Sequence, residues 1–345
     1  MKKFTIMAFM LLGGTVAMAQ NKWHTEPYLT KSLSSAGIKD VFAETSGGSI
    51  TVAGVAASEA RIEVYVSPNN SNDDISKEEV KQRLEDNYKL EITDADHELH
   101  VTAKSKGFNL NWRKTVSISF KIYVPKAVAT NLRTSGGSIN IADLTGAQNF
   151  ATSGGSLKVS NVSGKIKGRT SGGSINVVDA KQDIDLTTSG GSITASNCQG
   201  TIRLVTSGGS LKLNKLSGDI NATTSGGSIH GDDIAGEFIT STSGGSVNLT
   251  QLACSVEGST SGGSIHADFK SLGKYVRFST SAGGITITMP TPKGLDLDLK
   301  GNRVNASLSN FSGTKEKDRV EGKLNGGGIP VVAHASSGSV NLNFN

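Results

Sequence analysis

A five-residue motif, Thr-Ser-Gly-Gly-Ser, recurs at a constant interval of eighteen residues, and it constrains the fold of this chain more than any other feature. A further copy begins at Thr45, and degenerate copies begin at Thr280, Leu299, Leu324 and Ala335. A short fixed period is typical of solenoids, in which each repeat forms one coil and successive coils stack. The regular copies begin at Thr134, Thr152, Thr170, Thr188, Thr206, Thr224, Thr242 and Thr260.

Apolar residues within each period predict two short strands. With the second Ser of the motif as position one, positions two and four are apolar, as in Ile139 and Ile141, and so are positions eleven and thirteen, as in Ile184 and Leu186. Alternation by two indicates a strand, and the extra apolar residue at position seven indicates a bend. We expect the Gly-Gly pair to form a corner with positive φ. Position six is mostly Asp or Asn, which favours a turn and a side-chain ladder.

Stacking of coils about 4.8 Å apart would give each strand a partner and create one narrow apolar core. The small share of aromatic residues, 5%, leads us to expect small aliphatic side chains in this core. Glycine is abundant, at 42 of 345 residues, which in other chains indicates low-complexity disorder. The constant spacing of the glycines argues against disorder. The predicted fold class is therefore all-β, a single-chain β-solenoid with eighteen-residue coils and an N-terminal cap of strands and one helix.

The N-terminus has the pattern of a signal peptide. Lys2 and Lys3 precede an apolar run from Phe4 to Val16, and Ala17-Met18-Ala19 supplies the small residues of a cleavage site. We therefore expect cleavage after Ala19 and a periplasmic, outer-surface or secreted protein. The apolar run is too short to span a bilayer comfortably, and no later run approaches twenty residues. Beyond residues 1–19, we expect an N-terminal strand segment over 20–44, a first coil with its cap over 45–133, the regular solenoid over 134–300, and irregular closing coils over 301–345.

The segment between the motif at Thr45 and the motif at Thr134 lacks the period and is predicted to cap one end. A helix is expected from Asp74 to Asn87, with Asn72 or Asp73 as its N-cap. Its apolar face would contain Ile75, Val80 and Leu84. A cap is needed because an open solenoid end exposes unpaired backbone groups. Strands are expected over 60–66, 89–93, 98–103 and 116–124.

Three local sequences resemble a known family. They are the Ser-Gly-Gly-Ser-Ile coils, the strand ending in Ile122-Tyr123-Val124-Pro125, and Asn325-Gly326-Gly327-Gly328 followed by Ser337-Gly338-Ser339. Over residues 30–345 the chain resembles the adhesin family of exported bacterial β-solenoids, a domain family of unknown function. The resemblance implies a right-handed β-helix and an exported location, and it brings no catalytic residue or cofactor.

Two surfaces are candidates for contact with a partner. The outward side of the first strand is small and polar and includes Asn140, Lys158, Asn176 and Lys212. The other candidate is a segment between two predicted strands, with Phe108, Trp112, Arg113 and Lys114, which could contact an acidic glycan or an envelope partner. Burial of Phe108 and Trp112 against the cap is the alternative that we favour. The repeated Thr and Ser hydroxyls could also match a polymer, but local turn chemistry explains them more simply.

Catalysis needs acids that converge, and the sequence does not predict such a cluster. Asp183 with Asp185 is the best local pair, followed by Asp232 with Asp233, and neither has more than one further carboxylate in register. His230 and His266 lie two coils apart, too far to share a metal ion. Formal net charge is +5, or +3 without Lys2 and Lys3, and no run of basic residues indicates nucleic-acid binding. We therefore expect no enzyme, no cofactor and no metal site.

The sequence thus predicts an exported, adhesin-like structural or binding protein whose partner is a cell-surface glycan or an envelope component. A polysaccharide-active lyase or hydrolase and an envelope-stress accessory protein are the alternatives, and the oligomeric state stays open. Cys198 and Cys254 are predicted to be free thiols, because slightly more than three coils place them about 14 Å apart along the axis. Position nine, held by Cys254, is expected to be a turn, which would make this thiol the more reactive.

Overall fold

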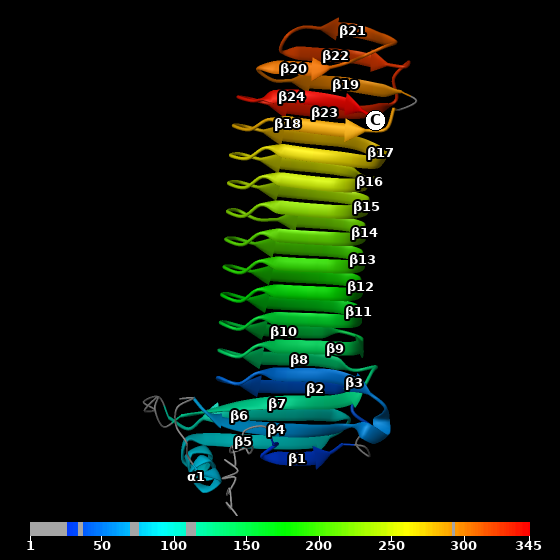
Figure 1. The fold of residues 1–345 in the computed structure, drawn as a ribbon. Coiled ribbons are helices and arrows are strands. Elements are labelled where there is room, and N and C mark those ends of the chain that lie inside the picture. The colour runs from blue at the N-terminus through cyan, green and yellow to red at the C-terminus, as the bar shows by residue number, and fades with distance from the viewer. Residues whose placement is uncertain (1–25, 34–36, 70–75, 108–114, 292–293) are drawn as a thin grey trace, which may run out of the picture.

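The protein is a tall stack of flattened coils in the computed structural model, which describes residues 26–33, 37–69, 76–107, 115–291 and 294–345 (Figure 1). Successive strands pair in parallel with a register of one period, so that Leu157 faces Ile175 and Ile175 faces Ile193. The predicted β-solenoid is confirmed. Its regular strands are β8 (Ala129–Thr134), β9 (Ile139–Thr145), β10 (Gln148–Thr152), β11 (Leu157–Thr170), β12 (Ile175–Thr188), β13 (Ile193–Thr206), β14 (Leu211–Thr223), β15 (Ile229–Thr242), β16 (Val247–Thr260) and β17 (Ile265–Thr280).

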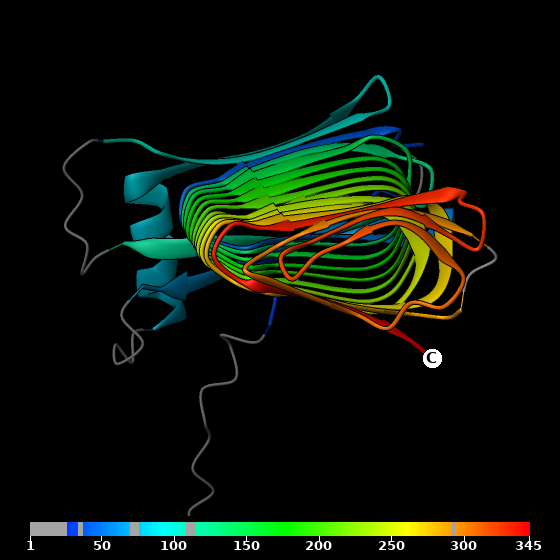
Figure 2. The same cartoon turned by 90° about the horizontal axis from the view of Figure 1, so that it is seen from above.

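Each coil has two long sides, one from positions two to four and one from positions eleven to fourteen (Figure 2). The bend between them is made at position six, where every residue from Asp143 to Gln251 has φ between 52° and 58°. Asp and Asn tolerate this left-handed conformation better than most residues, which explains their frequency here. Their side chains also form the expected ladder, since Asn161 Nδ2 donates to Asp143 Oδ1 at 2.7 Å and Asn197 bonds Asp179.

The Gly-Gly corner is required by close approach of backbones, not by positive φ, so that part of the prediction is wrong. None of the regular corner glycines is among the described residues with positive φ. An added Cβ on Gly155 would lie 2.0 Å from the Gly137 carbonyl oxygen, whereas one on Gly154 would have 3.6 Å to its nearest neighbour. The buried Thr152 hydroxyl donates to the same Gly137 oxygen at 2.8 Å and accepts from the Gly155 N–H. Each Thr therefore ties one corner to the next.

The interior contains one continuous core, and it is not restricted to small aliphatic side chains as we expected. Phe150, Phe238 and Phe278 are fully or almost fully buried within the regular coils. Space for two of them comes from glycine in a neighbouring coil: a Cβ on Gly168 would lie 2.4 Å from the Phe150 ring, and one on Gly258 would lie 2.8 Å from the Phe278 ring. Large and small residues thus alternate along the axis to keep the core filled.

At the N-terminal end the stacking order departs from the chain order. The Thr45 coil, β2 (Asp40–Thr45) and β3 (Ile50–Val55), pairs with β8 and β9 on one side and with β6 (Glu98–Ser105) and β7 (Val116–Pro125) on the other. Antiparallel strands then cover the outer edge: β5 (Tyr88–Ala95) pairs with β6, β4 (Arg61–Pro68) with β7, and β1 (Leu29–Ser32) with β4. The four strands expected in this segment are confirmed, and a short 3-10 helix, η2 (Ala57–Glu59), joins β3 and β4.

The helix of the cap is shorter than predicted. Helix α1 (Lys77–Asn87) begins after Ser76, whose hydroxyl accepts a hydrogen bond from the Glu79 N–H at 3.1 Å. Ser76 is therefore the N-cap; Asn72, Asp73 and Ile75 lie outside the described residues. Val80 and Leu84 are buried as expected.

The C-terminal end is closed by strands that fold back into the stack. After β18 (Ile285–Met289) the chain forms β19 (Leu295–Lys300), β20 (Arg303–Ala306), β21 (Phe311–Lys315) and β22 (Arg319–Leu324). It then returns as β23 (Ile329–Ala335) between β17 and β19, and as β24 (Ser339–Phe344) between β18 and β20. The antiparallel pairs β19–β22 and β21–β22 cover this end.

Candidate functional site

The outward residues of the first long side form one straight row, which we call the Asn/Lys row. It contains the four residues that the sequence indicated, Asn140, Lys158, Asn176 and Lys212, each in register with the next strand. Eleven steps of about 4.8 Å give the row a length of about 50 Å. All its members are polar: Thr51, Asn140, Lys158, Asn176, Thr194, Lys212, His230, Asn248, His266, Thr286, Asn341 and Asn305.

The Asn/Lys row offers spaced polar groups on a flat side. Lys158, Asn176 and Lys212 are exposed, while Asn140 is half-buried and its amide donates to Thr51 Oγ1 at 3.4 Å. In the neighbouring column, the Asp232 carboxylate accepts hydrogen bonds from Asn214 at 3.0 Å and Thr250 at 2.7 Å. His230 and His266 are separated by Asn248, so two strand steps lie between them.

The second predicted surface cannot be placed in the same way. Phe108, Trp112, Arg113 and Lys114 lie outside the described residues. Just before them, the Lys104 ammonium lies 3.2 Å from a carboxylate oxygen of Glu44 on β2.

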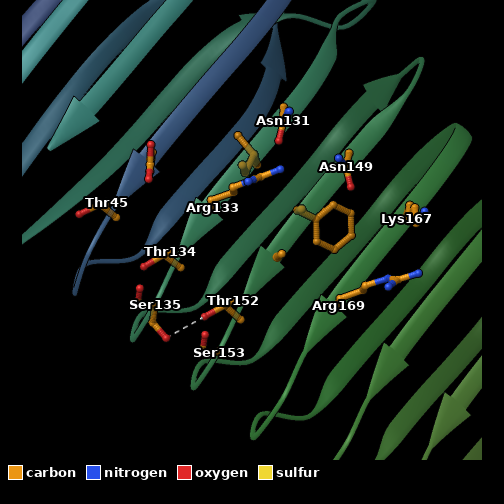
Figure 3. Close-up of a pocket in the computed structure, with 14 residues that line it drawn as sticks. Thr45, Asn131, Arg133, Thr134, Ser135, Asn149, Thr152, Ser153, Lys167 and Arg169 are labelled. Carbon is orange, nitrogen blue, oxygen red and sulfur yellow. Dashed lines mark hydrogen bonds between the residues drawn. The ribbon is translucent and has the colours of Figure 1, made fainter. Parts of the chain in front are cut away.

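The second long side carries a shallow groove that the sequence reasoning missed (Figure 3). We call it the basic groove, and its volume is about 460 Å³. It crosses β2, β8, β10 and β11, where two outward columns run side by side. One column is Glu44, Arg133, Ala151 and Arg169, and the other is Phe42, Asn131, Asn149 and Lys167. The small Ala151 side chain between Arg133 and Arg169 accounts for the hollow.

The cations of the basic groove are exposed and have no partner among the described residues. Arg133, Lys167 and Arg169 form neither an ion pair nor a side-chain hydrogen bond there. Glu44 is instead paired with Lys104, and Asp185, the next residue of the second column, is paired with Arg203 at 2.8 Å. Free cationic groups, with nearby acids already paired, leave a local excess of positive charge.

An aromatic pair borders the basic groove at its N-terminal end. The rings of Phe42 on β2 and His100 on β6 stack with their centroids 4.6 Å apart and their planes 9° from parallel. Phe42 is half-buried, and the pair lines a second hollow that shares Glu44, Asn131 and Arg133 with the groove. The two hollows therefore form one continuous depression.

The acidic residues considered for catalysis form one neighbouring pair, Asp219 with Glu237, but do not converge as a larger group. Asp183 and Asp219 are separated by Thr201 in register, and so by two strand steps, or about 10 Å. The carboxylate of Asp185 pairs with Arg203, and that of Asp233 pairs with Lys270 at 2.9 Å. Among the residues that the structure describes, no group of three or more His, Cys, Asp or Glu side chains could hold a metal ion.

The repeated threonines are not available to a ligand. From Thr134 to Thr280 the motif threonines are buried, and their hydroxyls are used between coils. The interpretation as turn chemistry therefore fits these positions.

Both cysteines are free, as predicted, but Cys254 is not an exposed turn residue. Its side chain is buried in the core, with 1% of its surface exposed, and burial raises the pKa of its thiol to about 12. Burial also raises the pKa of the Cys198 thiol. The expectation that Cys254 is reactive is therefore wrong, because a thiol reacts as its thiolate. Glycine at position nine of other coils, such as Gly146 and Gly164, led us to expect a turn there, and these glycines do have positive φ. Cys254, at the same position in the β16 coil, does not have positive φ.

Comparison with known proteins identifies the family. The model of one domain family, Toastrack DUF4097, matches residues 47–343. The chain belongs to the Toastrack DUF4097 family. This confirms the expected membership of an adhesin-related family of unknown function, and the Toastrack match extends from β3 through the regular coils to the C-terminal strands.

Two solved structures are similar to this Toastrack chain. One is a provisionally assigned cell adhesion protein from Clostridium sporogenes, with 10% identity, a TM-score of 0.19, and coverage of 93% of this chain and 100% of that one. The other is a provisionally assigned adhesin from Bacteroides fragilis, with 12% identity, a TM-score of 0.28, and coverage of 91% and 96%. None of the curated proteins matches the chain. Across the described residues, no helix has the length and apolar character needed to cross a membrane.

Proposed function

We propose that this Toastrack protein is an exported, adhesin-like binding protein that uses the long sides of its solenoid as contact surfaces and does not catalyse a reaction. The observation that carries the proposal is the pair of rigid, flat sides whose outward residues form long polar rows, above all the Asn/Lys row. Such a surface suits a partner that is itself extended and repetitive, such as a cell-surface glycan or an envelope polymer.

Rigidity supports this function. Every corner is tied to the previous one by a buried Thr hydroxyl, as in Thr206 to Gly191 at 2.7 Å, and every strand is paired on both edges through the regular coils. A surface that is ordered before contact loses little conformational freedom on binding, so weak polar contacts can add up along its length.

Export is part of the proposal and rests on residues 1–19, which lie outside the described residues. The signal-peptide pattern can be tested directly. Expression of the full chain in a bacterial host, followed by N-terminal sequencing of the exported product, should give Gln20 as the first residue. Retention of an uncleaved chain in the cytoplasm would contradict export.

The experiment for the function is a glycan array with the purified mature protein, followed by a search for turnover of each bound glycan. We expect binding without cleavage products. The double variant Asp183→Asn/Asp185→Asn should bind as the wild type does, because these carboxylates neither converge with a third acid nor line the basic groove. A lyase or hydrolase activity lost in that variant would contradict the proposal and favour a carbohydrate-active enzyme.

A further inference from the structure

The free cations in the basic groove are spaced at intervals along the solenoid axis, which suits an extended polymer with a regularly repeated negative charge. Arg133 and Arg169 occupy one column with Ala151 between them, so about 10 Å separates their strands. Lys167 lies in the adjacent column on the same strand as Arg169. A ligand with anionic groups at intervals of this size can meet these cations in succession without bending.

The neighbouring residues add groups that bind sugars rather than bare anions. Asn131 and Asn149 lie side by side in the second column and present amides that both donate and accept hydrogen bonds, as sugar hydroxyls require. The Phe42 ring at the end of the groove is half-buried and has one face stacked on His100, and its remaining exposed surface offers an apolar contact for the C–H groups of a sugar ring. From β6 to β11 the depression crosses four strand steps, or about 19 Å, so it can hold several sugar units.

We propose that the basic groove binds a carboxylate-bearing polysaccharide, lying along the solenoid axis from the Phe42–His100 pair to Arg169. The inference rests on the proposed function and assigns it a site and a ligand class. Duplex nucleic acid fits less well, because its phosphates are denser, at about one per 3.4 Å of each strand. Ala151, Asn131 and Asn149 interrupt the cations, so closely spaced phosphates would not each meet a positive charge.

Binding of polygalacturonate, compared with the same polymer after reduction of its carboxyl groups to alcohols, tests the inference. We expect the reduced polymer to bind at least about tenfold more weakly, because it loses the charge-assisted contacts. Arg133→Gln/Arg169→Gln should weaken binding of polygalacturonate by a similar factor and hardly affect the reduced polymer. Phe42→Leu should weaken binding of both polymers, by about threefold or more.

The matched control is Lys181→Gln/Lys215→Gln, which removes two exposed cations that lie outside both the basic groove and the Asn/Lys row. We expect its affinity for polygalacturonate to stay within about twofold of the wild type. All variants should first be shown to melt as the wild type does, since these side chains are on the surface.

Three results would overturn the inference while leaving the proposed function intact. They are equal affinity for the two polymers, an equal loss in the control pair, and tighter binding of single-stranded polythymidylate than of polygalacturonate. If instead the wild type bound no glycan on an array and no polymer here, the proposed function itself would fail.

Discussion

The two glycines of each corner give a sharp test of how the coils fit together. Gly172 and Gly173 are adjacent in mid-stack, and neither has positive φ. A Cβ on Gly173 would lie 2.0 Å from the Gly155 carbonyl oxygen, whereas a Cβ on Gly172 would lie 3.7 Å from its nearest neighbour. We therefore expect Gly173→Ala to destabilise the protein strongly and Gly172→Ala to be nearly neutral.

The expected cost of Gly173→Ala follows from the contacts that must open. A Cβ needs at least 3.0 Å from a backbone atom, so the two coils must separate by about 1 Å at this corner. That movement would stretch the Thr170 Oγ1 to Gly155 hydrogen bond, now 2.8 Å, and the Gly172 N–H to Ser153 bond, now 2.9 Å, beyond bonding distance. Loss of the two bonds, of which the first leaves the buried Thr170 hydroxyl unpaired, amounts to about 2–4 kcal/mol.

Hydrogen exchange measured by mass spectrometry, together with urea unfolding, tests this difference. Exchange is the more direct assay because a long repeat array can open locally without two-state unfolding. In Gly173→Ala we expect loss of protection in the coils on both sides of the corner and a lower urea midpoint. Gly172→Ala should match the wild type or gain up to about 1 kcal/mol from a less flexible unfolded chain. Equal behaviour of the two variants would refute the close-approach explanation.

Three further predictions concern the interior. Thr206→Val should lower the free energy of unfolding in urea by about 1–3 kcal/mol, because the Gly191 carbonyl oxygen loses the hydrogen bond that the Thr206 hydroxyl donates at 2.7 Å. Ser207→Ala, at an exposed position, should be neutral. Gly168→Ala should lower the free energy of unfolding by about 1–3 kcal/mol, because the new methyl group crowds the Phe150 ring. The double variant Gly168→Ala/Phe150→Leu should lose less than the sum of the two single losses, and a loss equal to that sum would contradict the packing argument. Neither cysteine should react with a thiol reagent at pH 8 without denaturant. With the pKa of Cys254 near 12, stability should fall as pH rises above about 8.5, and this part of the fall should be absent in Cys254→Ala.

The regular coils could be predicted because every physical requirement repeats at one interval. The eighteen-residue spacing of the motif equals the register between neighbouring strands, as in the pairing of Leu157 with Ile175. The apolar positions lie in the core because alternation by two places one side of each strand inward. These features depend only on neighbours one coil away.

The backbone conformation of the turns was harder to assign, because two chemical explanations fit the same residues. Glycine is needed both for positive φ and for close approach, and the sequence alone does not separate them. In the structure, Gly155 meets a carbonyl oxygen, while the left-handed residues are Asp143, Asn161 and their equivalents. The frequency of Asp and Asn at position six was the signal for the second role, since these residues enter the left-handed region most readily after glycine.

The N-terminal end of the basic groove could not be predicted because it depends on strands that are neighbours in space but distant in sequence. Phe42 and Glu44 belong to the Thr45 coil, and they meet Asn131 and Arg133 only because β2 lies between β6 and β8. The period is absent over the 89 residues that separate the motifs at Thr45 and Thr134, so no spacing indicates this register. Within the regular coils, Arg169 and Lys167 looked like ordinary solvent-exposed residues. Their grouping with Arg133 follows from the eighteen-residue period, since Arg133, Ala151 and Arg169 are one period apart, and only the addition of the Thr45 coil to the groove depends on the fold of the cap.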